Sequence, residues 1–345
     1  MKGERLFDIS RSRGLVISMF PLLLAGCSPR VATSFWKIGT EADSVRPGYA
    51  VMAEGKKVRH CYPITEWRTT DEKEDVYHSL HHHGVAVESE LMAYRIYFDK
   101  KQTIDPYCKK KPQLELAQSH WYPNDSLLAE GYGDDILRVS GTVGVGSVKY
   151  WNGKKHVHIE PVAERSQRIV SKKKNEATIE VAVKGWIVPT ANSQELTADM
   201  STRYTMHAGH RDMRCDVSLS EAVDGLCTGV QTIPAKGGSD TTTIILPNGV
   251  LLASWGTDWP VNDSAKYAKE TVGLAVFIPK QFAGSLVHDK QNNLCLLNPL
   301  PFREGLGVGL HFYLTCCGAT KENHPVARTA EEWLTYLRRW AKHLR

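Results

Sequence analysis

The sequence predicts an all-β protein: a large antiparallel β-sandwich followed by one C-terminal amphipathic helix. From about residue 45 to residue 320, apolar and polar residues alternate with a period of two, which is typical of strands with one buried face. Gly, Pro, Asn and Asp cluster between these segments, as expected for turns. Strands do not alternate with helical segments, which disfavours a parallel Rossmann-like sheet.

Two Asn-Gly dipeptides predict tight hairpins. Asn152-Gly153 lies within KYWNGKKHVHIEPV, and Asn248-Gly249 lies within TIILPNGVLLASW. Asn-Gly between two strand-like runs is a strong local signal for an antiparallel pair. Further β-rich segments are NEATIEVAVKGWIV, ADMSTRYTMHA, RCDVSLS, ETVGLAVFIP and GVGLHFYLTCC. The length of the chain does not require a second domain.

The tail, residues 326–345, has a helical pattern. Thr329 and Glu332 form a capping-box pattern at its start. Trp333, Leu337, Trp340 and Leu344 then recur at helical spacing. We expect this helix to pack its apolar face against the outside of a sheet, which is ordinary core building and not a membrane contact.

The first residues predict export. Four basic residues precede the apolar run LVISMFPLLL, which is too short for a transmembrane helix and reads as a signal peptide over residues 1–26. The run ends in Leu-Ala-Gly followed by Cys27, which resembles the lipobox of bacterial lipoproteins. We expect a lipid on Cys27, a tether over 27–44, and a periplasmic or outer-membrane-anchored protein. The alternative is an ordinary secretory signal with an unmodified cysteine.

Charge and cysteine content limit the partners. The formal net charge of +5 is accompanied by no clustered basic helix or base-stacking motif, so nucleic acid is not expected as a partner. The balance gives slight support for an acidic ligand. No other apolar run is long enough to span a bilayer, so membrane contact is expected only through the lipid. Seven cysteines remain besides Cys27, and Cys215 with Cys227 is a candidate disulfide across a hairpin.

The stretch YHSLHHHGVAVESELMAYRIYFDKKQTID, residues 77–105, combines histidines and glutamates before a strand-like run. It allows three interpretations: a metal site, the wall of a sugar-binding cleft, or polar residues at a strand entrance. On an extended chain His81 and His83 share one face while His82 points to the other, and Glu88 shares a face with Glu90. A divalent metal would use His81, His83 and Glu88, whereas a sugar would contact His82, His83 and Glu90. A cofactor is therefore either absent or a divalent metal.

Arg95 lies between apolar neighbours in MAYRIYFDK. A buried guanidinium needs a partner, and Asp99 would share its face of the strand. The alternative is that Arg95 faces a cleft and binds a carboxylate of the ligand.

A second group lies in TRYTMHAGHRDMRCD, where proton carriers and arginines gather beside the Gly209 turn. Arginine neutralises a carboxylate, and histidine or tyrosine moves protons, so this composition suits chemistry on an acidic sugar. The alternative is a polar hairpin end. The candidates are Tyr204, His207, His210, Arg211 and Arg214.

A third group lies in QSHWYPNDSLLAEGYGDDILRVSGTVGVGSV. His120, Trp121 and Tyr122 are expected to form a stacking platform for a sugar, and Asp134 precedes a strand. The glycines of GTVGVGS lack phosphate-loop spacing, so close backbone approach is the better interpretation. Linear spacing leaves open a paired-carboxylate glycosidase that uses two residues of a larger acidic set. Its members are Glu88, Glu90, Asp134, Asp135 and Glu270.

Three blocks resemble a family of exported proteins known as a domain of unknown function, found in carbohydrate-utilisation loci of Gram-negative polysaccharide degraders. They are HHHGVAVESELMAYRIYFDKKQTIDPY, EGYGDDILRVSGTVGVGSVKYWNGK and RYTMHAGHRDMRCDV. The resemblance covers most of residues 45–320, and an ulvan oligosaccharide dehydratase is similar to this family. It implies β-elimination on uronate oligosaccharides derived from pectin or ulvan. For the fold, the expectation is a supersandwich, galactose-mutarotase-like, over residues 45–325.

Elimination beside a uronate carboxylate needs a cation, a base and an acid. From these residue types we assign Arg211 or Arg95 to the carboxylate, His207 or His210 to proton abstraction, and Tyr204 to the departing hydroxyl. Two other functions stay open at this point. A hydrolase would need two carboxylates facing one cleft. A non-catalytic sugar-binding lipoprotein would depend on aromatic platforms such as Trp121, Trp255 and Trp259.

Overall fold

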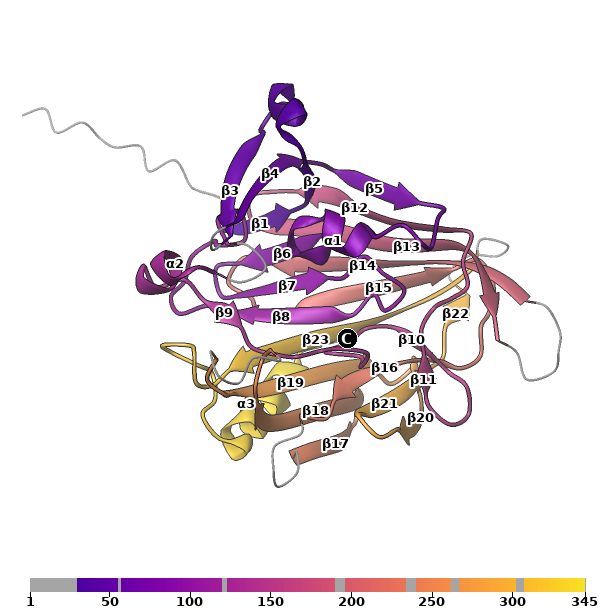
Figure 1. Ribbon diagram of the computed structural model, residues 1–345. Helices are drawn as coiled ribbons and strands as arrows, with labels where there is room; N and C mark the ends of the chain where they lie inside the picture. The colour runs from indigo at the N-terminus through magenta and orange to yellow at the C-terminus, as the bar shows by residue number, and fades with distance from the viewer. Residues whose placement is uncertain are drawn as a thin grey trace, which may run out of the picture.

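The computed structural model describes residues 30–54, 57–119, 123–189, 196–233, 240–261, 267–301 and 307–344. Every named strand pair is antiparallel, and the strands form four sheets (Figure 1). The predicted antiparallel β-sandwich with a C-terminal helix is therefore confirmed. The signal segment and Cys27 lie outside the described residues, as do His120, Trp121 and Tyr122.

One layer is a ten-stranded sheet that runs the height of the molecule (Figure 1). Its long central strands alternate buried and less buried residues, so one face belongs to the core between the layers. β22 pairs only with β23, beside the main path of the sheet. In order, the strands are β5 (Glu66–Thr69), β12 (Glu164–Lys172), β13 (Glu176–Val188), β14 (Leu196–His207), β15 (Met213–Leu219), β23 (Val308–Gly318), β19 (Glu270–Pro279), β18 (Gly249–Asp258) and β17 (Asp240–Leu246), with β22 (Leu300–Pro301).

The facing layer consists of two five-stranded sheets that lie one above the other in front of the large sheet (Figure 1). The upper sheet has β1 (Val31–Ser34), β6 (Ala86–Ser89), β7 (Met92–Ile96), β8 (Ile104–Cys108) and β9 (Asp134–Asp135). The lower sheet has β11 (His156–Val157), β10 (Lys149–Trp151), β16 (Leu226–Gln231), β21 (Asn292–Leu297) and β20 (Ala283–His288). Side chains from both layers form one hydrophobic core.

The glycine-spaced segment after residue 141 connects the two smaller sheets. Gly144 forms a parallel bridge with Ile104 of the upper sheet, and Val145 forms an antiparallel bridge with Val230 of the lower sheet. Gly144 has a φ of 55°, and a Cβ there would lie 2.2 Å from the Ile104 carbonyl oxygen. Only glycine permits both this conformation and this contact. The interpretation of these glycines as points of close backbone approach is confirmed.

A small three-stranded sheet projects from the body at the top of Figure 1. It contains β2 (Trp36–Gly39), β4 (Lys57–Pro63) and β3 (Ala50–Glu54), with the 3₁₀ helix η1 (Glu41–Val45) at its tip. Short helical turns connect strands elsewhere: α1 (Val76–Ser79), the 3₁₀ turn η2 (His81–His83) and α2 (Asp125–Ala129). None of the helices in the described part of the chain is long and apolar enough to span a membrane.

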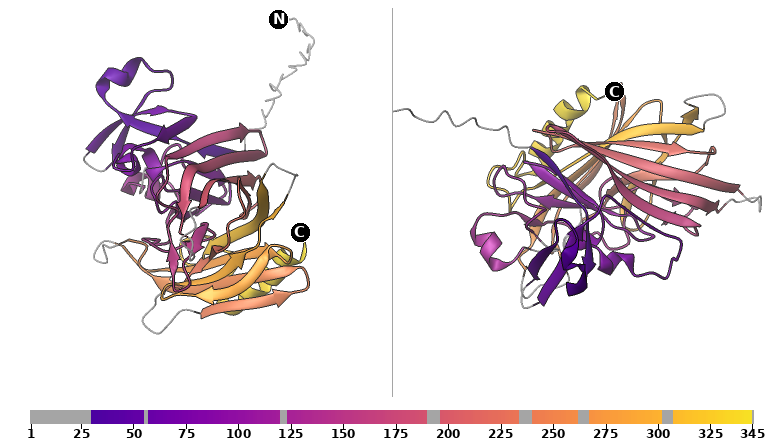
Figure 2. Two further views of the ribbon diagram at one scale, coloured as in Figure 1. Left: turned by 90° about the vertical axis from the view of Figure 1, so that its right-hand side faces the viewer. Right: turned by 90° about the horizontal axis from the view of Figure 1, so that it is seen from above.

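The C-terminal helix α3 (Ala330–Lys342) lies on the outer face of the large sheet, behind it in the view of Figure 1 and at the top of the right-hand view of Figure 2. Trp333 and Leu337 are fully buried against Leu251 and Phe277 of β18 and β19. The Thr329 hydroxyl accepts the Glu332 amide at 3.2 Å, as predicted for the N-cap. The Glu332 carboxylate receives the Arg328 amide at 2.7 Å, one residue before the position that a capping box uses.

Both predicted hairpins exist, but their turns differ from the expected ones. In β17–β18, Leu246 pairs with Gly249, so the turn residues are Pro247 and Asn248. In β10–β11, Trp151 pairs with His156, which leaves a four-residue loop around Asn152-Gly153. The predicted Cys215–Cys227 disulfide is wrong. The two residues lie in different sheets, because β15 pairs with β14 and β23 and not with β16, and both thiols are free.

Candidate functional site

A cavity of about 440 Å³ lies where the two smaller sheets meet, within the size range of small-molecule sites. Several strands end at it, so it is built from residues far apart in the sequence. β16 ends beside it at Gln231 and β18 at Asp258, and the segment after β9 forms one wall. Its lining includes Tyr77, Tyr97, Lys101, Asp135, Arg138, Thr142, Gln231, Asp258 and Gln291.

A buried ion-pair network supports one wall of this cavity. One terminal nitrogen of Arg95, Nη2, lies 2.6 Å from Oδ2 of Asp105 and 2.8 Å from Oδ2 of Asp135. The Tyr97 hydroxyl donates to the same Asp105 oxygen at 2.5 Å. Arg95 is 2% exposed and Asp105 is fully buried, whereas Tyr97 and Asp135 reach the cavity. The predicted partner Asp99 is therefore wrong, and Arg95 supports the wall without lining it.

Burial shifts the pKa values of the carboxyl and phenol groups in this wall. Burial, and next the neighbouring Asp105, raises the pKa of Asp135 to about 7, against the opposing effect of Arg95. Burial likewise raises the pKa of Asp105 and holds the pKa of the Tyr97 phenol well above its usual value. The two carboxylates share one guanidinium, so they titrate as a pair. A carboxyl group with a pKa near neutrality is suited to accept or donate a proton during catalysis.

Tyr77 and His83 form a stacked pair next to this wall. Their ring centroids are 3.7 Å apart, and Tyr97 meets both rings edge-on. Nδ1 of His83 lies 3.0 Å from the Tyr77 carbonyl oxygen, so this nitrogen donates the hydrogen bond. Burial lowers the pKa of His83 to about 3, which keeps the ring neutral at neutral pH, and burial raises the pKa of Tyr77 to about 12. Tyr77 therefore keeps its phenolic proton at the cavity.

The remaining rim carries two cations and an acid. Lys101 pairs with Asp99 at 3.1 Å, and Arg138 lies 3.9 Å from Asp258. The side chains of Lys101 and Arg138 are 30% and 43% exposed, so both have room to turn toward a bound anion. Both groups line the cavity, and a carboxylate on a ligand would meet them there.

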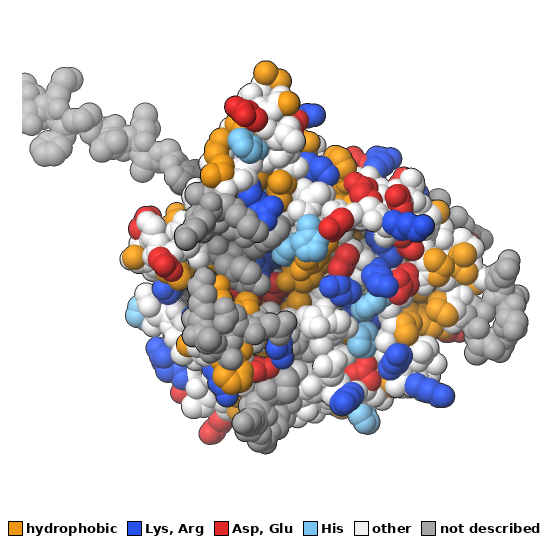
Figure 3. All heavy atoms as spheres, in the orientation of Figure 1, with side chains coloured by type: hydrophobic (Ala, Val, Ile, Leu, Met, Phe, Trp, Pro, Cys, Tyr) orange, Lys and Arg blue, Asp and Glu red, His pale blue; other side chains and the backbone are white. Residues whose placement is uncertain are grey.

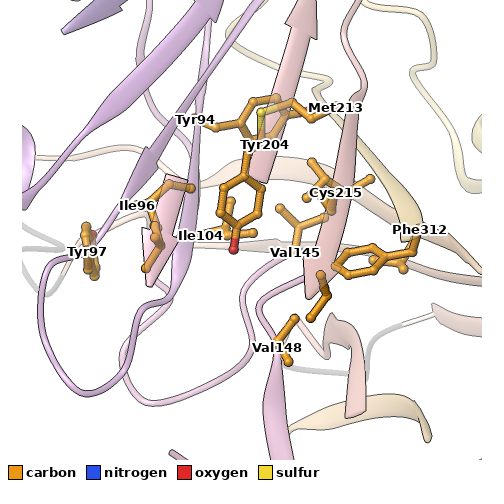
Figure 4. Packing of buried hydrophobic residues seen from close by; sticks show 14 of the residues in the cluster. Tyr94, Ile96, Tyr97, Ile104, Val145, Val148, Tyr204, Met213, Cys215 and Phe312 are labelled. Carbon is orange, nitrogen blue, oxygen red and sulfur yellow. The ribbon is translucent and has the colours of Figure 1, made fainter. Parts of the chain in front are cut away.

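Tyr204, predicted as the proton donor, does not lie in a cavity. It is 3% exposed and packs between the sheets among Tyr94, Ile104, Val145 and Cys215 (Figure 4). Burial raises its pKa far above the usual value. The alternation of β14 directs this side chain inward, so its phenol cannot reach a bound sugar.

The other members of that predicted cluster also fail to converge. His207 is exposed and lies 3.3 Å from Glu176, while His210 pairs with Asp212 at 3.1 Å; neither lines the cavity. Arg211 is largely buried and lies 2.7 Å from Glu322, so its positive charge is already paired with a carboxylate of the protein. Arg214 shares a face of β15 with Asp216, and its side chain contacts Asp216 and Tyr313. The interpretation of this segment as one catalytic group is corrected to a set of separate structural contacts.

The histidine-rich segment is not extended, which corrects the predicted faces. Residues 81–83 form η2, with φ near +60° at His82 and His83. As a result His81 stacks on His82 with centroids 3.9 Å apart, and Nε2 of His82 lies 2.8 Å from the Leu116 carbonyl oxygen. Of the three predicted sugar contacts on this segment, only His83 adjoins the cavity, through its stack on Tyr77.

The acidic candidates have protein partners. Glu88 forms a buried ion pair with Lys109, Glu90 pairs with Arg30, and Asp134 pairs with Lys321 at 2.8 Å. Among the described residues, no group of three His, Cys, Asp or Glu side chains is placed to hold a metal ion.

The aromatic platforms expected for a sugar-binding protein are dispersed. Trp255 packs near Trp333 of α3, with ring centroids 6.4 Å apart, on the outer face of the large sheet. Trp259 lies under the Lys269 ammonium, 4.3 Å from the ring centroid. Trp121 belongs to residues that the structure does not describe.

The three sequence blocks do touch, but at different points. The Ser89 hydroxyl donates to the His210 carbonyl at 2.6 Å, and the Tyr94 hydroxyl donates to the Arg211 carbonyl at 2.5 Å. The first and second blocks meet at Arg95 and Asp135. Sequence reasoning missed Tyr77, Tyr97, Lys101, Arg138 and Asp258 as site residues, although Asp135 was among the carboxylates considered. Tyr77 and Tyr97 flank the histidines in the stretch 77–105, which was the one available signal.

Residues 37–345 match the protein family described as Domain of unknown function (DUF4861). The chain belongs to this family. No curated protein matches the chain. Membership therefore brings no activity with it, and a function has to be argued from the cavity.

Proposed function

We propose that the chain is an enzyme that acts on uronate-containing oligosaccharides by β-elimination, as a dehydratase that releases water or as a lyase that releases a sugar. One observation carries the proposal: Asp135, Tyr77, Lys101 and Arg138 line the same cavity. A carboxyl group titrating near neutrality, a protonated phenol and two cations are the groups that this reaction needs.

The difficult step is removal of the proton beside the uronate carboxylate. That proton is weakly acidic until the carboxylate charge is neutralised. Lys101 and Arg138 supply positive charge at the rim, where the sugar carboxylate would bind in place of their present carboxylate partners. Arg138 offers a planar pair of donors, which suits bidentate binding of a carboxylate.

Asp135 then takes the proton from C5 of the uronate. The electrons of that C–H bond form the C4–C5 double bond, and the C4–O bond breaks. Tyr77 gives its proton to the departing oxygen, so water leaves in a dehydratase and a sugar hydroxyl leaves in a lyase. Transfer of the abstracted proton from Asp135 back to Tyr77 through solvent restores both groups.

In this scheme Arg95, Asp105 and Tyr97 are positioning residues. Arg95 fixes the Asp135 carboxylate, and the Leu137 amide donates to its other oxygen at 3.1 Å. Asp105 opposes the charge of Arg95 and helps to keep the pKa of Asp135 raised. His83 holds the Tyr77 ring by stacking and by its hydrogen bond to the Tyr77 carbonyl.

Substrate class and compartment are also part of the proposal. The resemblance of the three blocks to proteins of polysaccharide-utilisation loci, and to ulvan oligosaccharide dehydratase, supports pectin- or ulvan-derived substrates. The lipobox-like sequence at Cys27 supports an exported lipoprotein in the periplasm or on the outer membrane. Replacement of Cys27 by Ala should release the protein from the membrane fraction and abolish incorporation of a labelled fatty acid.

The test is incubation of the purified protein with pectic and ulvan oligosaccharides, with and without divalent metal. Ultraviolet absorbance of the conjugated acid and product mass are followed together. Loss of one water identifies a dehydratase, and chain cleavage with the same chromophore identifies a lyase. We expect Asp135→Asn and Tyr77→Phe each to slow turnover by about 10² or more. His207→Gln, outside the cavity, serves as the matched control and should retain full turnover.

Absence of both chromophore and mass change on all of these substrates would overturn the elimination proposal. Equal activity of Asp135→Asn and the parent protein would overturn the assigned base.

A paired-carboxylate hydrolase is the second candidate, because Asp258 lines the same cavity as Asp135. Two carboxyl groups across one cleft are the requirement for glycoside hydrolysis. In that case the products gain one water, no chromophore forms, and Asp258→Asn is as damaging as Asp135→Asn. For elimination, Asp258→Asn should leave the chromophore-forming activity largely intact.

A further inference from the structure

A second cavity, of about 580 Å³, adjoins the first on the lower sheet. It lies between the β10–β11 hairpin and the β20–β21 turn, and it shares Gln291 with the central cavity. Figure 3 shows Lys, Arg and His side chains gathered on this face over the same hairpin. The second cavity, here called the basic cavity, is lined by Lys154, Lys155, His156, Val157, His158, Glu160, Asp289, Lys290 and Gln291.

The basic cavity carries uncompensated positive charge. Among the described residues, no carboxylate pairs with Lys154, Lys155 or Lys290. The two acids in its lining already have partners: Asp289 lies 2.5 Å from Nδ1 of His156, and Glu160 lies 3.3 Å from Lys100. Three ammonium groups are thus left facing one concave surface, which favours an anionic ligand.

Hydrogen bonds connect the lining of the basic cavity to the wall of the central cavity. Nε2 of His156 lies 2.9 Å from the Gly141 carbonyl oxygen. The Asn292 amide nitrogen donates to Asp289 at 2.8 Å, and its amide oxygen accepts the Val143 amide at 2.9 Å. Val139, Ser140 and Thr142 line the central cavity, so these bonds connect the two linings.

Another cavity beside the central one has the opposite charge. It has a volume of about 330 Å³ and shares Tyr77 and Lys101 with the central cavity and Glu160 with the basic cavity. Three cations in its lining, Lys100, Lys101 and Arg165, are outnumbered by six acids: Asp71, Glu72, Glu74, Asp75, Asp99 and Glu160. A polyanionic chain bound at the centre is therefore repelled on this side and attracted on the lysine side.

We propose that the basic cavity binds the next anionic sugar of the substrate, through its carboxylate or a sulfate ester, while the end being processed occupies the central cavity. The inference rests on the proposed function of the central cavity. It assigns a direction to the substrate chain, because of the two cavities beside the central one only the basic cavity has an excess of cations in its lining.

The experiment compares Lys154→Gln/Lys155→Gln/Lys290→Gln with a control that loses the same charge elsewhere. The control is Lys172→Gln/Lys174→Gln/Lys280→Gln, which changes three exposed lysines outside all three cavities. Calorimetric binding is measured in an Asp135→Asn background, and turnover in the parent background. The probes are a uronate monosaccharide, which has no next sugar, and a uronate tetrasaccharide without sulfate and with sulfate esters.

We expect the basic-cavity variant to bind the tetrasaccharide about tenfold more weakly and to raise KM by a similar factor, since each lysine contributes a modest interaction. The monosaccharide, which reaches only the central cavity, should be bound within about twofold of the control. If only the sulfated tetrasaccharide is bound more weakly, the cavity is assigned to a sulfate ester. If the tetrasaccharides with and without sulfate are both bound more weakly, the cavity is assigned to the carboxylate.

Failure of this inference is distinguishable from failure of the proposed function. Turnover without any difference between the two triple variants overturns the basic cavity as a subsite and leaves elimination standing. Length-dependent binding that needs the three lysines, without turnover, supports the subsite and overturns elimination. No binding of any probe overturns the subsite.

Discussion

The central cavity and the Tyr204–Arg214 segment contain similar residue types, but only the cavity brings them together. Tyr204 to Arg214 are close in sequence and run along a strand, a turn and the next strand, so their side chains point to different sides. Tyr77, Lys101, Asp135 and Asp258 are far apart in sequence, yet they line one surface. Proximity along a β-strand is therefore poor evidence for a shared site, because neighbouring side chains alternate between faces.

The largest expected effect concerns the buried guanidinium that supports the cavity. Arg95→Leu leaves Asp105 and Asp135 without their shared cation, and removal of one partner of a buried pair costs about 3–5 kcal/mol of unfolding free energy. Arg214→Leu breaks a half-exposed pair with Asp216 and should cost less than about 1 kcal/mol. Urea unfolding measures both. Equal losses would show that the two arginines do not differ as the structure indicates.

The next effect tests the connection between the two smaller sheets. Gly144 and Gly209 both have positive φ, of 55° and 76°, so alanine is strained at either position. At Gly144 the new Cβ also lies 2.2 Å from a backbone oxygen, whereas at Gly209 the nearest atom is 3.7 Å away. We expect Gly209→Ala to cost about 1 kcal/mol and Gly144→Ala about 3 kcal/mol by thermal or urea unfolding. Similar values would mean that the Gly144 backbone can shift freely.

A smaller effect appears in the dependence of stability on pH. Burial lowers the pKa of His83 to about 3 from its ordinary value of 6.5. Between these values the unfolded chain binds a proton that the folded chain does not, so stability falls as the pH falls through this window. His83→Phe retains a ring to stack on Tyr77 and should flatten the profile below about pH 6.5. Urea unfolding across pH measures the slope, with the parent protein as the reference.

The smallest effect is expected for Tyr204→Phe. The Tyr204 hydroxyl lies in the core, so its loss should cost about 1 kcal/mol or less and leave turnover unchanged. Tyr77→Phe removes a hydroxyl at the cavity and should lower kcat while leaving the unfolding midpoint nearly unchanged. A loss of turnover in Tyr204→Phe as large as that in Tyr77→Phe would reverse the comparison between the two regions.

Much of the fold was predictable, because period-two patterns and turn residues act locally. The β13, β14, β15, β19 and β23 segments and the α3 helix were all expected where they occur. The arrangement into one large sheet and two smaller ones was not, since no local pattern states which strands pair across long separations. The exact hairpin turns also escaped prediction, because Pro247-Asn248 competes with Asn248-Gly249 for the same turn.

The candidate site was predictable only in part. The histidine-rich stretch 77–105 contained Tyr77, His83, Arg95 and Tyr97, and the second block contained Asp135. The sequence did not show which arginine is buried and paired, because the partners of Arg95 come from β8 and β9. Arg138 follows Asp135 by three residues and Asp258 directly precedes Trp259, but a single charged residue in such a segment does not show that it faces a cavity.

The sequence by itself determined the strand-forming segments, the close backbone approach at the glycines, and the capped C-terminal helix, because each follows from local periodicity or from the conformations that one residue type permits. The tertiary structure alone decided that Asp135, Tyr77, Lys101 and Arg138 line one cavity, and that one neighbouring cavity is rich in lysines and another in acids. Long-range strand pairing sets these distances, and the environment that results sets the pKa of Asp135.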